Sequence, residues 1–497
     1  MSSERRRLLG GTGWTLSSTI VALTVGAVMN PVLVLYLGVG GYGVWASAIA
    51  IASLFGFAGD LGVSAALTKF IAEREGKKEP LESFAASALI FGLAAGVTTG
   101  LTLGAVSLFF KSYGGYSNFG LLLALQALQM PFAMGSATLL GIFQGRRLFR
   151  PLALLTMIQS ALGLVLTIGL LANGQGLIGV MIASASGAIA FFGILLALNW
   201  KSVVPTRAGD FVEDFRKLVP FGIRLTATNA LSTVLYQIDI VILALVIGDP
   251  VLVGTYALAV FVTRAFWIIP GSISTTTYPV TSQYSATNDW RRVSTYLSTA
   301  FVASVAIMGI LGSGLVLFGR PVLGVVFGST AIGAYEIALI LLGGTGALGC
   351  LRAIAASIPG VGRPEVGLRI SAVGAVCMAI VSLIFTEFLG MPGTALAVSV
   401  CFGLVAFLLI RAVDNHVLGF ARTRLVSHRV VLTATVAIGS CGICYFVGLP
   451  ENAGPAWFVA AGLLWAAISV CLGVASGGRK TWGDIFRIPS RARAERD

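Results

Sequence analysis

The chain of 497 residues is 57% hydrophobic and 11% charged, which excludes a water-soluble protein because its polar residues could not cover so long a chain. The formal net charge of +13 could indicate nucleic-acid binding, but the basic residues lie in short loops between apolar runs and not on one folded surface. We therefore expect a polytopic membrane protein with no nucleic-acid partner.

Apolar runs of membrane-spanning length follow one another along the chain. A hydrocarbon core of about 30 Å requires roughly 20 apolar residues in helical form. The runs that satisfy this length cover residues 10–36, 42–71, 82–110, 118–143, 151–173, 176–199, 217–247, 251–280, 293–318, 322–351, 366–388, 392–414, 428–448 and 455–476. The sequence thus predicts an all-α polytopic protein of about 14 transmembrane helices.

Positive charge alternates between successive loops. With the amino terminus placed in the cytoplasm, the inside loops hold groups such as Arg146, Arg147 and Arg150, whereas the outside loops hold only Lys111 and Arg320. Because basic loops stay on the cytoplasmic side, this alternation predicts a multi-pass protein of the cell (cytoplasmic) membrane with both termini inside.

A weak internal repeat divides the chain. The run PFGIRLTATNA followed by VILALVIGDPVLVGTYALAVFVTRAF has the same layout as GGTGWTLSSTI followed by PVLVLYLGVGGYGVWASAIAIASLF, about 210 residues earlier. Six predicted helices separate the copies, so both enter the membrane in the same direction, as parallel repeats of secondary transporters do. We predict two pseudo-symmetric lobes of six helices, 1–210 and 211–416, followed at 417–497 by two further helices and a basic cytoplasmic tail.

The segment from Tyr36 to Glu73 resembles a known family. Its runs YLGVGGYGVWA and FAGDLGVSAALTKFIAE, which lead into a basic loop, resemble the start of the polysaccharide transporters, the Wzx-like flippases of lipid-linked oligosaccharides. The superfamily also holds the multidrug and toxin extruders and the lipid II flippases. The resemblance covers about the first eighty residues. It implies a flippase that moves a polyprenyl phosphate or diphosphate bearing sugars from the inner to the outer leaflet.

Charged residues inside the predicted helices are the candidates for function, because each costs several kcal/mol in hydrocarbon unless it is paired or hydrated. The helix 217–247 carries a polar stripe at steps of four, four, four and three, formed by Arg224, Thr228, Ser232, Tyr236 and Asp239. Such a stripe predicts that one face of this helix meets water or protein.

The helix 251–280 places Tyr256 and Arg264 on one face, two turns apart. An arginine suits a phosphate, because its planar fork donates paired hydrogen bonds and keeps its charge. We therefore expect Arg224, Arg264, Tyr236 and Tyr256 to bind the anionic headgroup. The structural alternative is that the arginines pair with carboxylates or extend to the membrane surface.

Three carboxylates, Asp60, Asp239 and Glu336, are candidates for coupling transport to H+ or Na+, or for salt bridges with those arginines. The six cysteines all fall in apolar segments, and CGIC at 441–444 lacks the second ligand pair that a zinc site requires. We therefore expect no metal site, no catalytic residue and no cofactor besides a coupling ion.

The predicted function is alternating-access transport of a lipid-linked oligosaccharide for surface polysaccharide or glycan biosynthesis. We expect a monomer that contacts membrane lipid and enzymes of the glycan pathway. One alternative is a cation-coupled multidrug or small-molecule extruder of the same superfamily, which usually turns acidic residues toward a cationic substrate. The other is a membrane glycosyltransferase or polymerase of the pathway, which usually carries a large external loop. The predicted outside loops are short, so we do not expect an enzyme.

Overall fold

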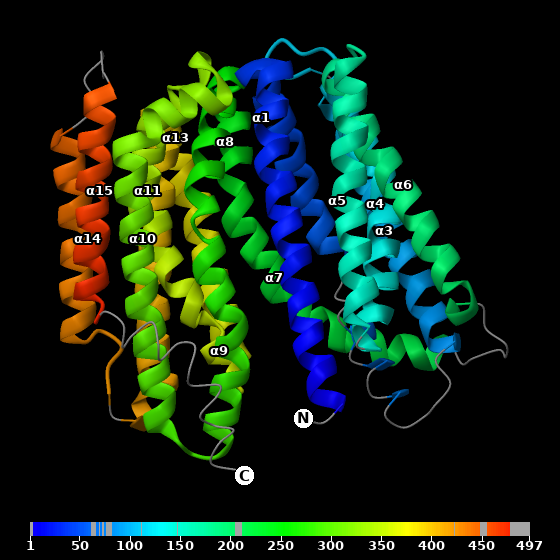
Figure 1. The fold of residues 1–497 in the computed structure, drawn as a ribbon. Helices are drawn as coiled ribbons and strands as arrows, with labels where there is room; N and C mark the ends of the chain where they lie inside the picture. Colours follow the sequence, from blue (N-terminus) through cyan, green and yellow to red (C-terminus); the bar gives the residue numbers. More distant parts are fainter. Residues whose placement is uncertain are drawn as a thin grey trace. The chain divides into compact units, whose positions relative to one another are not determined.

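The structure is a computed structural model that describes residues 3–60, 66–68, 70–71, 74–75, 82–110, 112–146, 148–203, 211–421, 423–447 and 455–477. These residues form helices and turns, with no β-strand among them (Figure 1). The helices are α1 (Ser3–Asp60), α3 (Glu82–Phe109), α4 (Phe119–Gly145), α5 (Phe149–Ala172), α6 (Gly176–Val203), α7 (Phe211–Ile247), α8 (Pro250–Ala265), α9 (Ile268–Ala286), α10 (Trp290–Phe327), η1 (Ser329–Ala331), α11 (Ala334–Ala355), α12 (Ser357–Gly360), α13 (Pro364–His416), η2 (Leu418–Ala421), α14 (His428–Val447) and α15 (Pro455–Ala475). The predicted all-α class is confirmed.

The described residues contain eleven helices that are long and apolar enough to cross a membrane, or twelve when the bent pair α8 and α9 counts as one span. Two of these helices are each long enough for two spans, because α1 has 58 residues and α13 has 53. Each changes direction at a glycine with positive φ, Gly38 at 69° and Gly390 at 66°, a conformation that other residues adopt at a cost. The two glycines lie between the predicted segments 10–36 and 42–71 and between 366–388 and 392–414. The prediction of about 14 spans is thereby confirmed.

One predicted turn is wrong. The segments 293–318 and 322–351 were expected to meet at Gly319, Arg320 and Pro321, but α10 continues through these residues to Phe327. The turn falls instead at Gly328, where φ is 88° and the backbone can reverse. The Tyr335 hydroxyl donates to the Val316 carbonyl oxygen at 2.7 Å and fastens the start of α11 to α10.

The predicted helix 251–280 is broken in two. Helix α8 ends at Ala265, α9 begins at Ile268, and their axes differ by 47°. At the break the Trp267 amide donates to the Arg264 carbonyl oxygen at 3.0 Å, and the Gly271 amide donates to the Trp267 carbonyl oxygen at 2.8 Å. These two hydrogen bonds satisfy part of the backbone at the break, as a membrane interior favours.

The chain groups into two compact units, Met1–Gly254 and Thr255–Asp497. Helix α7 belongs to the first unit because it packs against α1 and α3. The predicted boundaries at 210/211 and 416/417 follow from the internal repeat of the sequence. The two compact units follow from contacts between residues and do not test those boundaries. They stay a prediction.

A reciprocal backbone contact within the first unit relates the two repeat copies. A methyl group at Gly43 would clash with the Pro250 carbonyl oxygen and lie 2.6 Å from the Gly254 nitrogen. A methyl group at Gly254 would clash with the Val39 carbonyl oxygen and lie 3.0 Å from the Gly43 nitrogen. Val39 and Gly43 correspond to Pro250 and Gly254 at one constant offset, close to the 210 residues of the repeat. A contact in which each partner repeats the other's interactions is typical of a two-fold relation between two segments.

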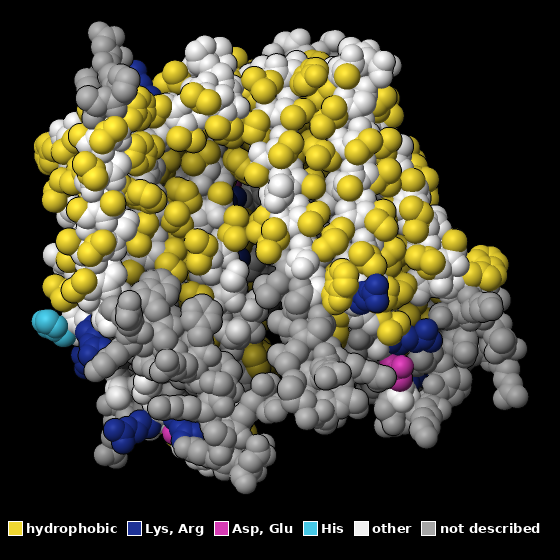
Figure 2. Space-filling view, in the orientation of Figure 1, with side chains coloured by type: hydrophobic (Ala, Val, Ile, Leu, Met, Phe, Trp, Pro, Cys, Tyr) yellow, Lys and Arg dark blue, Asp and Glu magenta, His cyan; other side chains and the backbone are white. Residues whose placement is uncertain are grey.

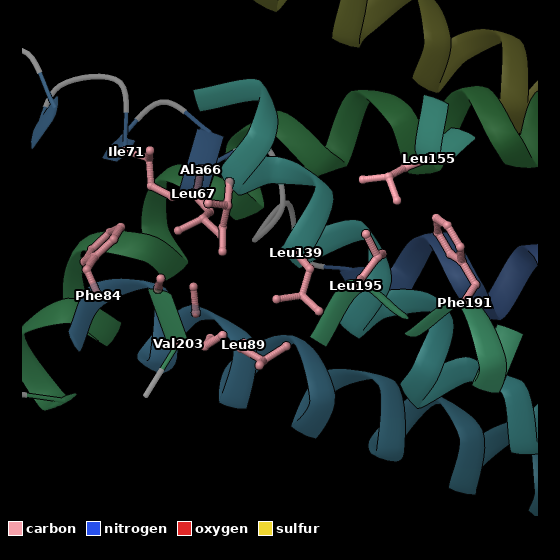
Figure 3. Close-up of a cluster of buried hydrophobic side chains, with 13 residues drawn as sticks. Ala66, Leu67, Ile71, Phe84, Leu89, Leu139, Leu155, Phe191, Leu195 and Val203 are labelled. Atoms are coloured by element: carbon pink, nitrogen blue, oxygen red, sulfur yellow. The ribbon is translucent and has the colours of Figure 1, made fainter. Parts of the chain in front are cut away.

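The core of the first unit is a set of fully apolar side chains. Figure 3 shows Phe84 and Leu89 of α3, Leu139 of α4, Leu155 of α5 and Phe191 of α6 in this cluster. These helices are therefore held together by packing of complementary apolar surfaces, the interaction that remains when lipid and protein are equally apolar.

The core of the second unit joins α10 to α14 and α15. The Trp465 indole N–H donates to the Ile310 carbonyl oxygen at 3.0 Å, and Leu317, Cys444 and Leu472 are buried around it. The outward faces of α14 and α15 expose large apolar side chains, among them Phe446, and Figure 2 shows hydrophobic side chains over most of the helical surface in view. Such faces suit lipid.

Candidate functional site

The break between α8 and α9 holds Arg264, which the sequence singled out. Arg264 lies in the last turn of α8, 14 residues after the helix begins at Pro250, so it lies about 21 Å along the helix axis. A cation is favoured there because the unsatisfied carbonyl groups at a helix carboxyl end carry partial negative charge. Arg264 as a whole is half-buried. The break thus places a permanent cation well inside a membrane-spanning element.

Trp267 fills the break. It is buried to 8% exposure, and its indole N–H donates to the Thr345 carbonyl oxygen of α11 at 2.7 Å. Its ring lies 5.7 Å from the ring of the fully buried Phe402 of α13. The backbone of Gly349 passes so close that a methyl group there would be 2.8 Å from the ring. Trp267 is therefore packed between α11 and α13, and its ring cannot turn without moving its neighbours.

Two guanidinium groups lie against this one indole ring. The Arg264 Cζ is 5.9 Å from the ring centroids of both Trp267 and Phe402, and the Arg352 Cζ is 4.9 Å from that of Trp267. Arg352 lies in the last turn of α11 and is also half-buried. Cation–π contacts of this kind stabilise by about 0.5 to 2 kcal/mol each and hold the cations in place without neutralising them.

The arrangement can bind an anion. Guanidinium groups are donors only, so neighbouring arginines present several N–H groups to one set of acceptor oxygens. Within the part of the chain that the structure describes, no three His, Cys, Asp or Glu side chains gather as metal ligands. The two guanidinium groups can recognise a ligand through charge and hydrogen bonds.

The other three predicted headgroup residues lie on α7 and α8. Tyr236 is half-buried on α7, and Tyr256 is fully buried on α8, two turns before Arg264. Arg224 belongs to α7, but its side chain lies outside the described residues. The substrate-binding roles of these three residues stay predictions.

The predicted coupling carboxylates lie in three different environments. Asp239 is fully buried on α7. Glu336 is exposed in the first turn of α11, where a carboxylate stabilises the amino end of a helix. Asp60 ends α1, and its side chain lies outside the described residues. Of the two carboxylates whose side chains are described, Asp239 has the burial expected of a residue that exchanges an ion inside the membrane.

Arg352, Trp267 and Phe402 were not predicted as site residues. Arg352 had been assigned to an inside loop because the predicted helix stopped at 351, whereas α11 continues to Ala355. The signal available in the sequence was an arginine within the apolar run GCLRAIAAS. Phe402 offers no such signal, because its role depends on the packing of α13 against α11.

A family model described as polysaccharide biosynthesis protein matches residues 8–285 of the chain. Among curated relatives, the probable low-salt glycan biosynthesis flippase Agl15 of Haloferax volcanii is 26% identical over 152 residues. That alignment covers 30% of this chain and 32% of the relative, so it spans about a third of either protein.

Two solved structures share the fold over most of their length. A lipid II flippase MurJ in an inward closed conformation superposes with a TM-score of 0.68 at 18% identity, covering 97% of this chain and 99% of that one. An inward-facing multidrug resistance MATE family transporter of the MOP superfamily superposes with a TM-score of 0.64 at 18% identity, covering 81% of this chain and 99% of that one. Both likenesses concern the fold.

Proposed function

Because the chain belongs to the polysaccharide biosynthesis protein family, we propose that it is a flippase for a lipid-linked oligosaccharide. The proposal draws on the family, on the similarity to the probable glycan biosynthesis flippase of Haloferax volcanii and on a fold shared with a lipid II flippase. The substrate would be a polyprenyl phosphate or diphosphate that carries sugars, and it would pass from the inner to the outer leaflet of the cytoplasmic membrane.

The observation that carries the proposal is the pair of arginines at Trp267. A phosphate group has acceptor oxygens and negative charge, so it complements Arg264 and Arg352, which offer donors and positive charge. A drug cation would be repelled by the same pair. The arginines thus favour the flippase over a multidrug extruder, although the fold serves both activities.

The remaining predicted residues take supporting roles in this proposal. Arg224, Tyr236 and Tyr256 would complete the headgroup site, and Asp60, Asp239 and Glu336 would exchange H+ or Na+. A coupling ion or the membrane potential would drive transport; one elementary charge that crosses 100 mV changes the free energy by about 2.3 kcal/mol. Transport would follow alternating access, with both termini in the cytoplasm and the protein acting as a monomer beside the enzymes that assemble the glycan.

The cellular test is deletion of the gene followed by analysis of the lipid-linked sugars on each face of the membrane. The flippase should leave the complete lipid-linked oligosaccharide on the cytoplasmic face and deplete the surface glycan. Normal surface glycan together with increased sensitivity to cationic dyes would contradict the flippase proposal and support a multidrug extruder.

A further inference from the structure

Helix α9, which continues from the arginine site, has a surface unlike those of its neighbours. The chain from Ala265 to Asn288 contains no charged residue and no histidine, but it contains nine serines and threonines. A helix face toward bulk water normally carries charged side chains, and a face toward lipid is apolar, as on α14 and α15. The composition of α9 therefore suits neither bulk water nor lipid.

The hydroxyl groups of α9 fall into two sets. In one set the Thr277 hydroxyl donates to the Ala353 carbonyl oxygen at 2.6 Å, and the Ser282 hydroxyl donates to the Gly360 carbonyl oxygen at 3.0 Å. These bonds attach α9 to α11 and α12. The Thr276 hydroxyl shares a hydrogen bond of 2.7 Å with the Tyr296 hydroxyl of α10. Four further polar side chains of α9 are exposed, those of Ser272, Thr275, Tyr278 and Gln283. We call these four residues the neutral polar face.

The hydroxyl groups of the neutral polar face present acceptors. The Ser272 hydroxyl donates its hydrogen to the Ile268 carbonyl oxygen at 2.9 Å, and the Thr275 hydroxyl donates its hydrogen to the Ser272 carbonyl oxygen at 2.7 Å. A hydroxyl has one hydrogen and two lone pairs, so each oxygen can still accept a bond from a ligand. These acceptors match the hydroxyl donors of a sugar.

Tyr278 and Gln283 extend this match. The Tyr278 side chain is 52% exposed and offers a flat apolar ring with a polar tip. Gln283 is exposed and offers an amide that both donates and accepts. An apolar ring among a few oriented polar groups is the usual composition of a small-molecule site.

The neutral polar face begins close to the two arginines. Ser272 follows Arg264 by eight residues and lies in the second turn of α9, just beyond the break. The donors at Trp267 and the acceptors on α9 thus succeed each other along one broken span, in the order in which phosphate and sugar succeed each other in a lipid-linked glycan.

We infer that α9 is a carbohydrate subsite whose neutral polar face binds uncharged sugar residues of the substrate next to its phosphate. The inference rests on the proposed function. It adds that the phosphate and the sugars of the ligand bind to two different surfaces. It assigns the phosphate to Arg264 and Arg352 and the sugar hydroxyls to Ser272, Thr275 and Gln283.

The test compares two probes on the full-length protein in detergent. One probe is farnesyl diphosphate, and the other is farnesyl diphosphate linked to a trisaccharide of neutral hexoses. The variant Ser272→Ala/Thr275→Val/Gln283→Leu removes exposed polar groups without adding bulk. The control Thr435→Val removes an exposed hydroxyl on α14 that donates to a helix carbonyl oxygen in the same way.

The triple variant should bind the glycosylated probe at least about tenfold more weakly than the wild type and the sugar-free probe within about twofold of it. Thr435→Val should bind both probes as the wild type does. Equal binding of the glycosylated probe by the variant, or a parallel loss of both probes, would overturn the subsite alone. A wild type that binds neither probe would contradict the proposed function itself.

Discussion

Arg264 shows how one charged residue can be stabilised inside a membrane-spanning element. Its charge cannot be lost at physiological pH, and removing it from water costs several kcal/mol. The carboxyl end of α8 and the rings of Trp267 and Phe402 offset part of this cost. The geometry of the site therefore depends on Trp267 as much as on the arginines.

The packing of Trp267 can be tested at two glycines of α11. Gly349→Ala should lower the free energy of unfolding by about 1 to 3 kcal/mol, because the new methyl group would be 2.8 Å from the indole ring and 2.9 Å from a Met308 methyl group. Gly346→Ala lies one turn away with no atom within 4 Å, so it should raise the free energy of unfolding by up to about 1 kcal/mol through helix propensity. Thermal unfolding in detergent measures both. Shifts of the same sign would show that Trp267 is not held as described.

At the scale of helices, glycines in the sequence correctly predicted where two spans turn back on each other. The glycines at 38 and 390 separate pairs of spans at the predicted places, because a turn needs its own special residue. Pro321 was misleading, since a membrane helix tolerates a proline and α10 continues through it. The break at Trp267 has a local signal in the pair Pro270-Gly271, but the contacts with α11 and α13 that hold Trp267 there are far away in sequence.

The reciprocal contact of α1 with α8 predicts a particular non-additivity. Gly43→Ala and Gly254→Ala should each lower the unfolding temperature, because each methyl group would fall on a backbone carbonyl oxygen that cannot move alone. The double variant should have an unfolding temperature only slightly below that of either single variant. Once the two segments have moved apart for one methyl group, the second also has room.

The control for this pair is Gly26→Ala, which introduces its methyl group into open space on α1. It should leave the unfolding temperature unchanged or raise it slightly. Additive losses for Gly43→Ala and Gly254→Ala would mean that the two glycines are not parts of one contact.

At the scale of the molecule, hydropathy was enough to predict the class and the number of spans, because the bilayer fixes the length of each helix. It was not enough to predict the site. Arg264 could be found as a charge in an apolar run, but Arg352 looked like a loop residue, and Phe402 is one phenylalanine among 29. Which side chains surround a given arginine is decided by tertiary packing, which one sequence does not encode in any local pattern.

The orientation of the whole chain is open to direct labelling. A cysteine introduced at Thr287, after α9, should react with an impermeant thiol reagent only from the cytoplasmic side, and one at Ser329, after α10, only from the outside. Both residues are exposed and flank a single long helix. The experiment requires a background without the six native cysteines. The reverse labelling pattern would invert the predicted topology.

The central claim is that this protein moves a lipid-linked oligosaccharide by binding its phosphate at Arg264. The most direct measurement is flipping of a fluorescent lipid-linked oligosaccharide in vesicles containing wild type, Arg264→Gln or Arg411→Gln. Arg411 is a suitable control because it is an exposed arginine on α13 that lies over Phe407 at 5.2 Å. Loss of charged hydrogen bonds worth about 1.5 to 3 kcal/mol should slow Arg264→Gln by at least about tenfold, while Arg411→Gln flips like the wild type. Equal rates for wild type and Arg264→Gln would contradict the account.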